Sequence, residues 1–389
     1  MTNILTLNAI SPVINDLFTE NYKVSSDAQK PVGIMLRSFN MHEYALDENT
    51  IAVARAGAGV NNIPIDEYAK LGVVVFNTPG ANANAVNELV INAMLLSSRN
   101  VIKAIEWVKT LKGGGSEVAK QVEKGKSQFV GHEITGKKLG IIGLGAIGSL
   151  VANSALGLGM EVVGYDPYLS VNSALKLSRH VKVVKELDDL IRTCDYITIH
   201  IPYIATSNKG FVNTNLISKM KDGVVIINCA RGELVNNADI ITAVESGKVA
   251  RYIVDFPVDE LIDRENIICI PHLGASTEEA EDNCAIMAAK ELIDYIENGN
   301  ITNSVNYPTC TMPRTTEFRL LVLHKNVQNI LAQITTIIAK EKINISNLSN
   351  QSKGDYAATI LDLEKQVSDK SINELTKIDG VIKVRKIDN

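Results

Sequence analysis

Side chains that could carry out acid–base chemistry follow three apolar runs in the middle of the chain. They are Arg231, then Asp255 with Asp259 and Glu260 close behind, and then His272. A histidine can take a hydroxyl proton while a hydride leaves the same carbon. An arginine can hold the neighbouring carboxylate bidentately, and a carboxylate bonded to the histidine orients it and raises its pKa. The set therefore predicts hydride transfer at a carbinol carbon beside a carboxylate.

A glycine motif predicts where the hydride acceptor binds. Gly143, Gly145 and Gly148 form G-x-G-x-x-G between an apolar run and a predicted helix. The first glycine allows a tight turn, the second lets the backbone approach a pyrophosphate, and the third lets helix and strand pack closely. Asp166 ends the next predicted strand, about 20 residues further on, where an acid hydrogen-bonds the adenosine ribose. A carboxylate there repels a 2′-phosphate, so we expect NAD rather than NADP.

The elements that position these residues alternate between strand and helix. Seven strands are predicted, at residues 139–142, 160–165, 181–184, 196–200, 224–228, 251–254 and 267–270. Their spacing indicates a doubly wound parallel sheet with ligands beyond the carboxyl ends of its strands. One long helix is expected over residues 84–107, a loop over 112–126 and a second long helix over 276–297.

The first 90 residues form a smaller α/β unit with strands at 4–7, 32–36, 51–54 and 73–76. Two of these strands run into Arg37-Ser38 and into Arg55, which is followed by a small-residue segment that includes Ala58 and Gly59. Arginines beyond strand ends could hold an anionic substrate, and the backbone N–H groups of the small-residue segment could bind a carboxylate.

The order of elements predicts a discontinuous domain organisation. Residues 1–90 and 278–305 form the substrate-binding domain, residues 91–277 form the NAD-binding domain, and residues 306–316 form a linker. Residues 317–389 are expected to form an independent, ferredoxin-like βαββαβ domain. The fold class is therefore α/β, with two Rossmann-like doubly wound parallel-sheet domains and a smaller C-terminal domain.

Composition excludes several classes of partner. A formal net charge of −5 over 389 residues gives no reason to expect a nucleic acid or an anionic membrane as partner. The five cysteines are dispersed without a C-x-x-C, which favours free thiols in a reducing cytoplasm and no metal site. The first residues show no basic region and no small-residue cleavage site, and no apolar run is long enough to span a bilayer. We therefore expect no signal peptide, no transmembrane helix and a cytoplasmic location.

Four motifs make the chain resemble the D-isomer-specific 2-hydroxyacid dehydrogenases over residues 30–305. They are residues 143–148, His200-Ile201-Pro202, residues 228–232 and residues 271–274. The resemblance implies that Arg231 binds the substrate carboxylate and that His272 is the acid/base. The cofactor contacts that it implies are Gly143, Gly145, Ala146, Ile147, Gly148, Asp166, Pro202, Cys229, Ala230, Asp255 and Gly274.

The histidine's acidic partner departs from the family pattern. The family usually reads Asp-Val-Phe-x-x-Glu-Pro, whereas this chain reads Asp-Phe-Pro-Val-Asp-Glu-Leu from Asp255. Counting five residues from Asp255 gives Glu260, and counting two from Pro257 gives Asp259. We take Glu260 as the partner, with Asp259 as the alternative.

Within the family the chain most resembles members that oxidise D-3-phosphoglycerate and feed serine synthesis. The strand ends at Arg37, Ser38, Arg55, Ala58 and Gly59 resemble their substrate-binding segments. Two alternatives remain: a reductase of hydroxypyruvate or glyoxylate, and a non-catalytic protein that senses NADH. The resemblance also implies a homodimer or homotetramer, in which the 84–107 helix and the 110–135 segment form the contact.

The C-terminal unit resembles an ACT domain, a small module that binds amino acids at a paired interface. His324, Asn326 and Asn344 match positions that contact L-serine in serine-inhibited members. The Pro-Gly that usually follows is replaced by Gln328-Asn329. The unit is therefore interpreted either as a serine site or as a module used only for dimerisation.

Overall fold

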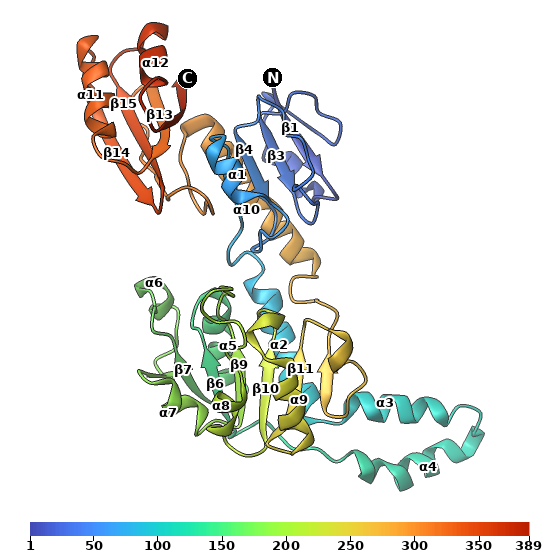
Figure 1. Ribbon diagram of the computed structural model, residues 1–389. Coiled ribbons are helices and arrows are strands. Elements are labelled where there is room, and N and C mark those ends of the chain that lie inside the picture. The colour runs from blue at the N-terminus through green and yellow to red at the C-terminus, as the bar shows by residue number, and fades with distance from the viewer. Residues whose placement is uncertain (389) are drawn as a thin grey trace. The chain divides into compact units, whose positions relative to one another are not determined.

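The computed structural model describes residues 1–388, which form two compact units, each described separately here (Figure 1). Unit 1 comprises Met1–Ala81 and Glu281–Asn389, and unit 2 comprises Asn82–Ala280. The predicted α/β class with parallel sheets is confirmed. The four-part domain boundaries stay a prediction. None of the helices in residues 1–388 is long and apolar enough to cross a membrane, and the cellular location stays a prediction.

Unit 2 is built on a seven-stranded sheet with the order β12-β11-β10-β9-β6-β7-β8, in which every pairing is parallel. Its strands are β6 (Lys138–Ile142), β7 (Glu161–Tyr165), β8 (Lys182–Val184), β9 (Tyr196–Ile199), β10 (Val224–Asn228), β11 (Val249–Val254) and β12 (Ile267–Cys269). All seven predicted strands are thus confirmed. The central strands are buried apolar runs, as a parallel sheet covered on both faces requires.

Helices cover both faces of this sheet. Residues of α2 (Ala83–Ser98) and α5 (Ala146–Gly157) form one apolar layer. Residues of α7 (Leu187–Ile191), α8 (Thr214–Ser218) and α9 (Asn237–Glu245) form the other. The short helix α6 (Val171–Ala174) and 3₁₀ turns at Gly232–Leu234 and Asp259–Leu261 complete the connections. The arrangement is the predicted doubly wound fold.

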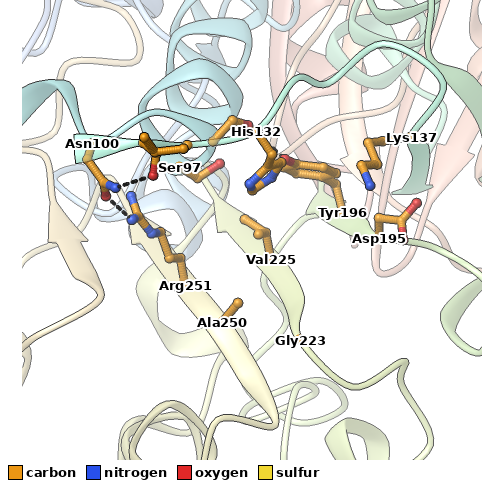
Figure 2. Close-up of a pocket in the computed structure, with 13 residues that line it drawn as sticks. Ser97, Asn100, His132, Lys137, Asp195, Tyr196, Gly223, Val225, Ala250 and Arg251 are labelled. Carbon is orange, nitrogen blue, oxygen red and sulfur yellow. Dashed lines mark hydrogen bonds between the residues drawn. The ribbon is translucent and has the colours of Figure 1, made fainter. Parts of the chain in front are cut away.

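The predicted helix over 84–107 is wrong, because two helices replace it. Helix α2 ends at Ser98, Arg99 is extended, and α3 (Val101–Thr110) begins after Asn100. Figure 2 shows the contact that fixes the break, in which Arg251 of β11 donates to the side-chain oxygen of Asn100. Arg251 also donates to the Leu96 carbonyl at 3.3 Å. The bond to Leu96 takes up a carbonyl in the last turn of α2, where carbonyls have no partner within the helix.

The predicted loop over 112–126 is also wrong. Helix α4 (Val118–Gly125) lies between 3₁₀ turns at Gly115–Glu117 and Lys126–Phe129. Trp107 of α3 packs against Phe129, with ring centroids 5.3 Å apart. Helix α3 has no buried residue, and it exposes Val101, Ile102, Ile105 and Val108 to solvent by 43–52%.

Unit 1 contains a five-stranded parallel sheet with the order β2-β1-β3-β4-β5. Its strands are β1 (Thr2–Leu7), β2 (Tyr22–Ser25), β3 (Gly33–Leu36), β4 (Ala52–Arg55) and β5 (Val74–Phe76). Helix α1 (Ile65–Lys70) packs on one face, and helix α10 (Glu278–Asn298) packs on the other. A 3₁₀ turn at Pro12–Asp16 follows β1. Four of the strands were predicted, and β2 was not.

The C-terminal part of unit 1 has the predicted βαββαβ order. Its antiparallel sheet has the order β14-β15-β13-β16, which is that of a ferredoxin-like fold. Its elements are β13 (Phe318–Lys325), α11 (Ile330–Lys340), β14 (Ile345–Lys353), β15 (Tyr356–Leu363), α12 (Asp369–Leu375) and β16 (Val381–Asp388). Residues of α11 and α12 cover one face of this sheet.

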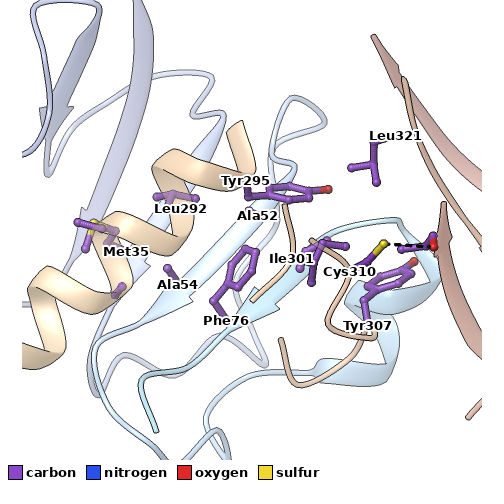
Figure 3. Packing of buried hydrophobic residues seen from close by; sticks show 14 of the residues in the cluster. Met35, Ala52, Ala54, Phe76, Leu292, Tyr295, Ile301, Tyr307, Cys310 and Leu321 are labelled. Carbon is purple, nitrogen blue, oxygen red and sulfur yellow. Dashed lines mark hydrogen bonds between the residues drawn. The ribbon is translucent and has the colours of Figure 1, made fainter. Parts of the chain in front are cut away.

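The other face of the C-terminal sheet shares a hydrophobic core with the N-terminal sheet and α10 (Figure 3). Leu321 and Ile360 from the C-terminal sheet join Phe76 of β5 and Leu292 of α10 in this core. Residues 306–316, predicted as a linker, contribute the fully buried Cys310. The prediction that residues 317–389 form an independent domain is therefore wrong. The face of the C-terminal sheet that α11 and α12 leave uncovered is also apolar, and it packs into the core of unit 1.

Arginines strengthen this packing at the C-terminal end of α10. Arg385 of β16 donates to the carbonyls of Tyr295 and Ile296 and lies 4.7 Å over the Tyr295 ring. Arg314 donates to the Glu297 carbonyl, and Arg319 donates to the carbonyl of the last helical residue. Cations and donors at a helix C-terminus satisfy its free carbonyls and oppose its dipole.

Candidate active site

The glycine loop between β6 and α5 has the geometry that a dinucleotide phosphate requires. Gly143 has φ +95°, and a Cβ on it would lie 2.5 Å from the His200 carbonyl oxygen. A Cβ on Gly148 would lie 1.9 Å from the Gly143 carbonyl oxygen, so helix and loop touch here. A Cβ on Gly145 would meet no atom within 4 Å. The loop therefore leaves open space at its middle glycine, beside the N-terminus of α5, where a pyrophosphate fits.

Asp166 lies beside this loop at the end of β7. One carboxylate oxygen accepts the Leu144 N–H at 2.9 Å, and the other accepts the Tyr168 N–H at 2.8 Å. The two bonds fix the carboxylate next to the glycine turn, which is where an adenosine ribose would lie if the pyrophosphate sits over Gly145.

Asp255 at the end of β11 organises the loop that carries His272. It is 1% exposed, and its two carboxylate oxygens accept the N–H groups of Leu273 at 2.7 Å and Gly274 at 2.8 Å. Burial raises the pKa of Asp255, against the effect of these two bonds and of His272. His272 has φ +56°, a left-handed conformation uncommon for residues other than glycine, and the two bonds that follow it hold that turn. Asp255 is thus a positioning residue in this chain, and its contact with a nicotinamide stays a prediction.

Glu260 and His272 line one cavity of about 890 Å³ in unit 2. The His272 ring is exposed and packs on Phe256, with ring centroids 4.7 Å apart. No hydrogen bond joins His272 to Glu260 or Asp259 anywhere in residues 1–388. Of the two acids, only Glu260 lines the cavity.

The segment after β10 fixes Arg231. The Asn228 side chain donates to the Arg231 carbonyl at 2.8 Å and accepts the Ala230 N–H at 3.1 Å. Cys229 is buried, and burial raises the pKa of its thiol to about 12, so the thiol stays protonated at neutral pH. Pro202 is exposed after β9. All five cysteines are free thiols, as predicted.

In unit 1 the structure brings Arg37 and Arg55 together at the carboxyl ends of neighbouring strands. The Arg55 side chain donates to the Arg37 carbonyl at 2.9 Å, and Arg37 forms an ion pair of 2.5 Å with Glu281. Ser38 and Ala58 are exposed beside them, and Gly59 is partly exposed. These residues thus lie together within unit 1, where Glu281 pairs with one of the two guanidinium groups.

The three candidate serine ligands do not meet within one chain. His324 is buried, and its ring nitrogens contact the Lys325 carbonyl at 2.8 Å and the Thr359 hydroxyl at 2.9 Å. Asn326 donates to the Gly354 carbonyl at the same end of the sheet. Asn344 lies at the opposite end of the sheet, because it directly precedes the first residue of β14, which pairs with Leu363. Asn344 instead donates to Glu364.

Comparison with known proteins agrees with this geometry. The model of the NAD binding domain of the D-isomer specific 2-hydroxyacid dehydrogenases matches residues 91–274. The chain is 33% identical over 347 residues to D-3-phosphoglycerate dehydrogenase of Haemophilus influenzae, which covers 86% of this chain and 80% of that relative. The chain belongs to the D-isomer-specific 2-hydroxyacid dehydrogenase family. The predictions of an NAD-dependent dehydrogenase and of NAD as its cofactor are confirmed.

Other members of the family extend the similarity. D-3-phosphoglycerate dehydrogenase of Escherichia coli K12 is 32% identical over 351 residues, which are 87% of this chain and 82% of that protein. The structure of the NAD⁺-bound 3-phosphoglycerate dehydrogenase of Entamoeba histolytica superposes with a TM-score of 0.62 at 26% identity. That match covers 78% of this chain and 98% of the Entamoeba histolytica chain. The assignment of the C-terminal sheet as an ACT domain stays a prediction.

Sequence reasoning missed some of the residues that line the cavity containing His272 and Glu260. Phe256, Lys209 and Asn236 also line that cavity. Phe256 directly follows Asp255, so its place after a strand end was a usable signal. Lys209 and Asn236 lie in connections far apart in the sequence, and no local pattern marks them.

Proposed function

We propose that this dehydrogenase oxidises the 2-hydroxyl group of D-3-phosphoglycerate with NAD, which gives 3-phosphohydroxypyruvate, the first step of L-serine biosynthesis. The observation that carries the proposal is the pair of arginines, Arg37 and Arg55, at adjacent strand ends in unit 1. An unphosphorylated hydroxy acid needs one cation for its carboxylate, whereas a phosphorylated one needs more. Similarity to two proteins named D-3-phosphoglycerate dehydrogenase over more than four-fifths of the chain supports the same substrate.

In this mechanism Gly143, Gly145 and Gly148 leave room for the pyrophosphate of NAD, and Asp166 binds the ribose. NAD, when bound, supplies the hydride acceptor. Arg231 binds the substrate carboxylate and polarises the oxygen of the reacting carbon. His272 takes the proton from the 2-hydroxyl group as the hydride leaves.

The surroundings of His272 suit this role. Asp255 holds the His272 loop through two backbone bonds, so the ring is placed without consuming either of its nitrogens. Phe256 packs on the ring and limits its rotation. Glu260 shares the cavity and is our choice for the carboxylate that orients the ring and stabilises its protonated form in the reacting complex.

The choice between the two acids has a direct test. Glu260→Gln should lower kcat by roughly 10²-fold or more, the range of a lost acid–base contribution. Asp259→Asn, the matched control one residue away, should leave kcat within about twofold. The reverse result would transfer the role to Asp259.

The activity itself is tested by following NAD reduction with D-3-phosphoglycerate. Wild-type protein should turn over, and His272→Asn should lose roughly 10²–10⁴-fold in kcat while its NADH affinity is retained. Unchanged turnover in His272→Asn would contradict the mechanism. Absence of turnover in the wild type, with NADH still bound, would contradict the proposed activity.

The assembly we propose is a homodimer or homotetramer in which α3 and α4 form a subunit contact. Its support is the apolar surface of α3, where Val101, Ile102, Ile105 and Val108 are each at least 43% exposed. Such exposed apolar groups are typical of interaction sites. Mass measurement by light scattering would contradict the proposal if the wild type were monomeric.

Serine regulation, if present, needs two copies of the chain. His324 and Asn326 lie at one end of the C-terminal sheet, and Asn344 lies near the other. We therefore propose that a serine site forms only where two C-terminal sheets pair. Inhibition by L-serine that persists in Asn344→Ala would contradict this arrangement.

A further inference from the structure

A polar cavity of about 300 Å³ lies in unit 2 at the amino end of the parallel sheet (Figure 2). The proposed catalytic residues follow the opposite, carboxyl ends of its strands. Its walls include Tyr196 at the start of β9, Val225 in β10 and Arg251 in β11. The volume is at the lower limit of ligand pockets, which range over roughly 300–1,000 Å³. The cavity can therefore hold a small molecule but not a dinucleotide.

The charged groups of the cavity are mainly cationic. Arg251 lies on one side of the His132–Tyr196 pair, and Lys137 lies on the other (Figure 2). Among residues 1–388 no salt bridge joins Arg251 or Lys137 to an acid, and the Arg251 hydrogen bonds go to neutral oxygens. The single carboxylate in the lining, Asp195, is already bound by Lys221 and by the Lys138 N–H.

The hydroxyl groups at the base of the cavity fix the tautomer of His132. The Ser98 hydroxyl donates to the Met94 carbonyl at 2.7 Å, so its oxygen accepts the Tyr196 hydroxyl proton at 2.7 Å. The Tyr196 oxygen must then accept from His132 Nε2, 2.8 Å away. Neutral His132 therefore carries its proton on Nε2, and its Nδ1 is an acceptor that becomes a donor on protonation.

We propose that this cavity binds a small oxyanion of the phosphate class, held by Arg251, Lys137 and the protonated form of His132. Cations on opposite sides of the ring suit a tetrahedral group with several acceptor oxygens better than a planar carboxylate. The site lies on a different edge of the sheet from the dinucleotide loop and is independent of the proposed reaction.

Binding is coupled to proton uptake by His132. Burial, Lys137 and Arg251 lower the pKa of His132, whereas Asp195 acts to raise it. Tyr196 is the other titratable group in contact with the ring. In the empty cavity the ring is therefore mostly neutral at pH 7. An anion favours the imidazolium, so the anion binds more tightly as the pH falls toward 6.

Sulfate is the appropriate probe, because it stays divalent from pH 5.5 to 8 and any pH dependence then belongs to the protein. Calorimetric titration of the full chain with sulfate, at ionic strength matched with sodium chloride, should give a saturable affinity that is higher at pH 6 than at pH 8. Repeating it in buffers of different ionisation heat should reveal proton uptake on binding.

Three variants separate this site from other cations of the chain. Arg251→Gln should weaken this binding roughly tenfold or more, since it removes a charged donor. His132→Gln keeps a donor for Tyr196 but cannot titrate, so the proton uptake should vanish. Lys138→Gln is the matched control, because Lys138 pairs with Glu161 outside the cavity, and it should bind like the wild type.

Sulfate binding that is absent from the wild type at pH 6, or equal in the wild type and Arg251→Gln, would overturn the proposal. Lys137→Gln provides a second variant if Arg251→Gln fails to fold, and an unchanged affinity there would overturn it equally. NADH affinity serves as the measure of folding. Competition against sulfate by inorganic phosphate, D-3-phosphoglycerate or acetate then identifies whether the site takes a free phosphate or a phosphorylated metabolite. Displacement of sulfate by acetate alone would contradict binding of a phosphate-class anion.

Discussion

Replacing Arg319 with methionine should destabilise unit 1 strongly. Arg319 of β13 and Asp362 of β15 are both fully buried and form a bidentate ion pair of 2.6 and 3.1 Å. The remaining guanidinium nitrogen donates to the carbonyls of Asn298 and Met312, each at 3.0 Å. These carbonyls belong to the end of α10 and to the segment before β13. One side chain therefore connects the C-terminal sheet to the rest of unit 1.

The magnitude follows from the charge that the substitution would strand. Removing one partner of a buried ion pair costs about 3–5 kcal/mol, because the other charge stays buried. The Thr315 N–H and hydroxyl still donate to Asp362, each at 3.0 Å, which favours the lower end of that range. For domains of about 150–250 residues each kcal/mol shifts Tm by roughly 2–4 °C, so Tm should fall by ~6–20 °C.

The pH dependence gives a second signature. Burial alone would raise the pKa of Asp362, but Arg319 and Thr315 outweigh it and lower the pKa. A lowered carboxyl pKa contributes stability above the unfolded value, near 4, and this stability is lost as the pH falls through the folded value. In Arg319→Met the carboxyl has no cation and takes up a proton more readily. The deficit in Tm should therefore be smaller at pH 4 than at pH 7.

Thermal unfolding followed by circular dichroism measures both effects, with NADH affinity as the control for unit 2. The double variant Arg319→Met/Asp362→Leu should recover much of the loss, since an apolar pair strands no charge. A fall in Tm of less than about 2 °C for Arg319→Met at pH 7 would refute the reasoning.

Two further predictions concern the dinucleotide loop. Gly148→Ala should cost about 1–3 kcal/mol of stability or more, because the new Cβ would lie 1.9 Å from a backbone oxygen. Gly145→Ala should change stability by no more than about 0.5 kcal/mol, because its Cβ has open space, and should weaken NAD binding instead. Thermal unfolding and NADH titration separate the two, and equal losses of stability would contradict this assignment of roles. Asp166→Ser should narrow the preference for NAD over NADP at least about tenfold, since it removes a charge that repels the 2′-phosphate; an unchanged ratio of kcat/KM values would exclude Asp166 from that role.

The parts of the fold that sequence predicted well depend on local pattern. The seven strands of unit 2 are apolar runs bounded by polar turns, and the close contact of Gly148 is with the Gly143 carbonyl, only five residues earlier in the chain. Asp255 and His272 were found because charged residues follow strand ends, and parallel strands bring those ends to one edge.

The parts that it missed depend on contacts between distant residues. The helix break at Asn100 has no proline or glycine to signal it, and it is set by Arg251 from a strand 151 positions away in the sequence. The burial of Cys310 was also invisible locally. One signal was available and not used: Leu320–Leu323 are apolar at four consecutive positions, which indicates a strand buried on both faces rather than the edge of an independent domain.

The most direct test of the account is NADH oxidation by the purified protein with 3-phosphohydroxypyruvate beside hydroxypyruvate, glyoxylate and 2-oxoglutarate. The account predicts a kcat/KM for the phosphorylated acid that exceeds the others by about tenfold or more, the worth of a charge-assisted contact to phosphate. Equal or better turnover of the unphosphorylated acids would contradict it. Arg37 and Arg55 would then not form a phosphate site, and the chain would be a general 2-hydroxyacid reductase.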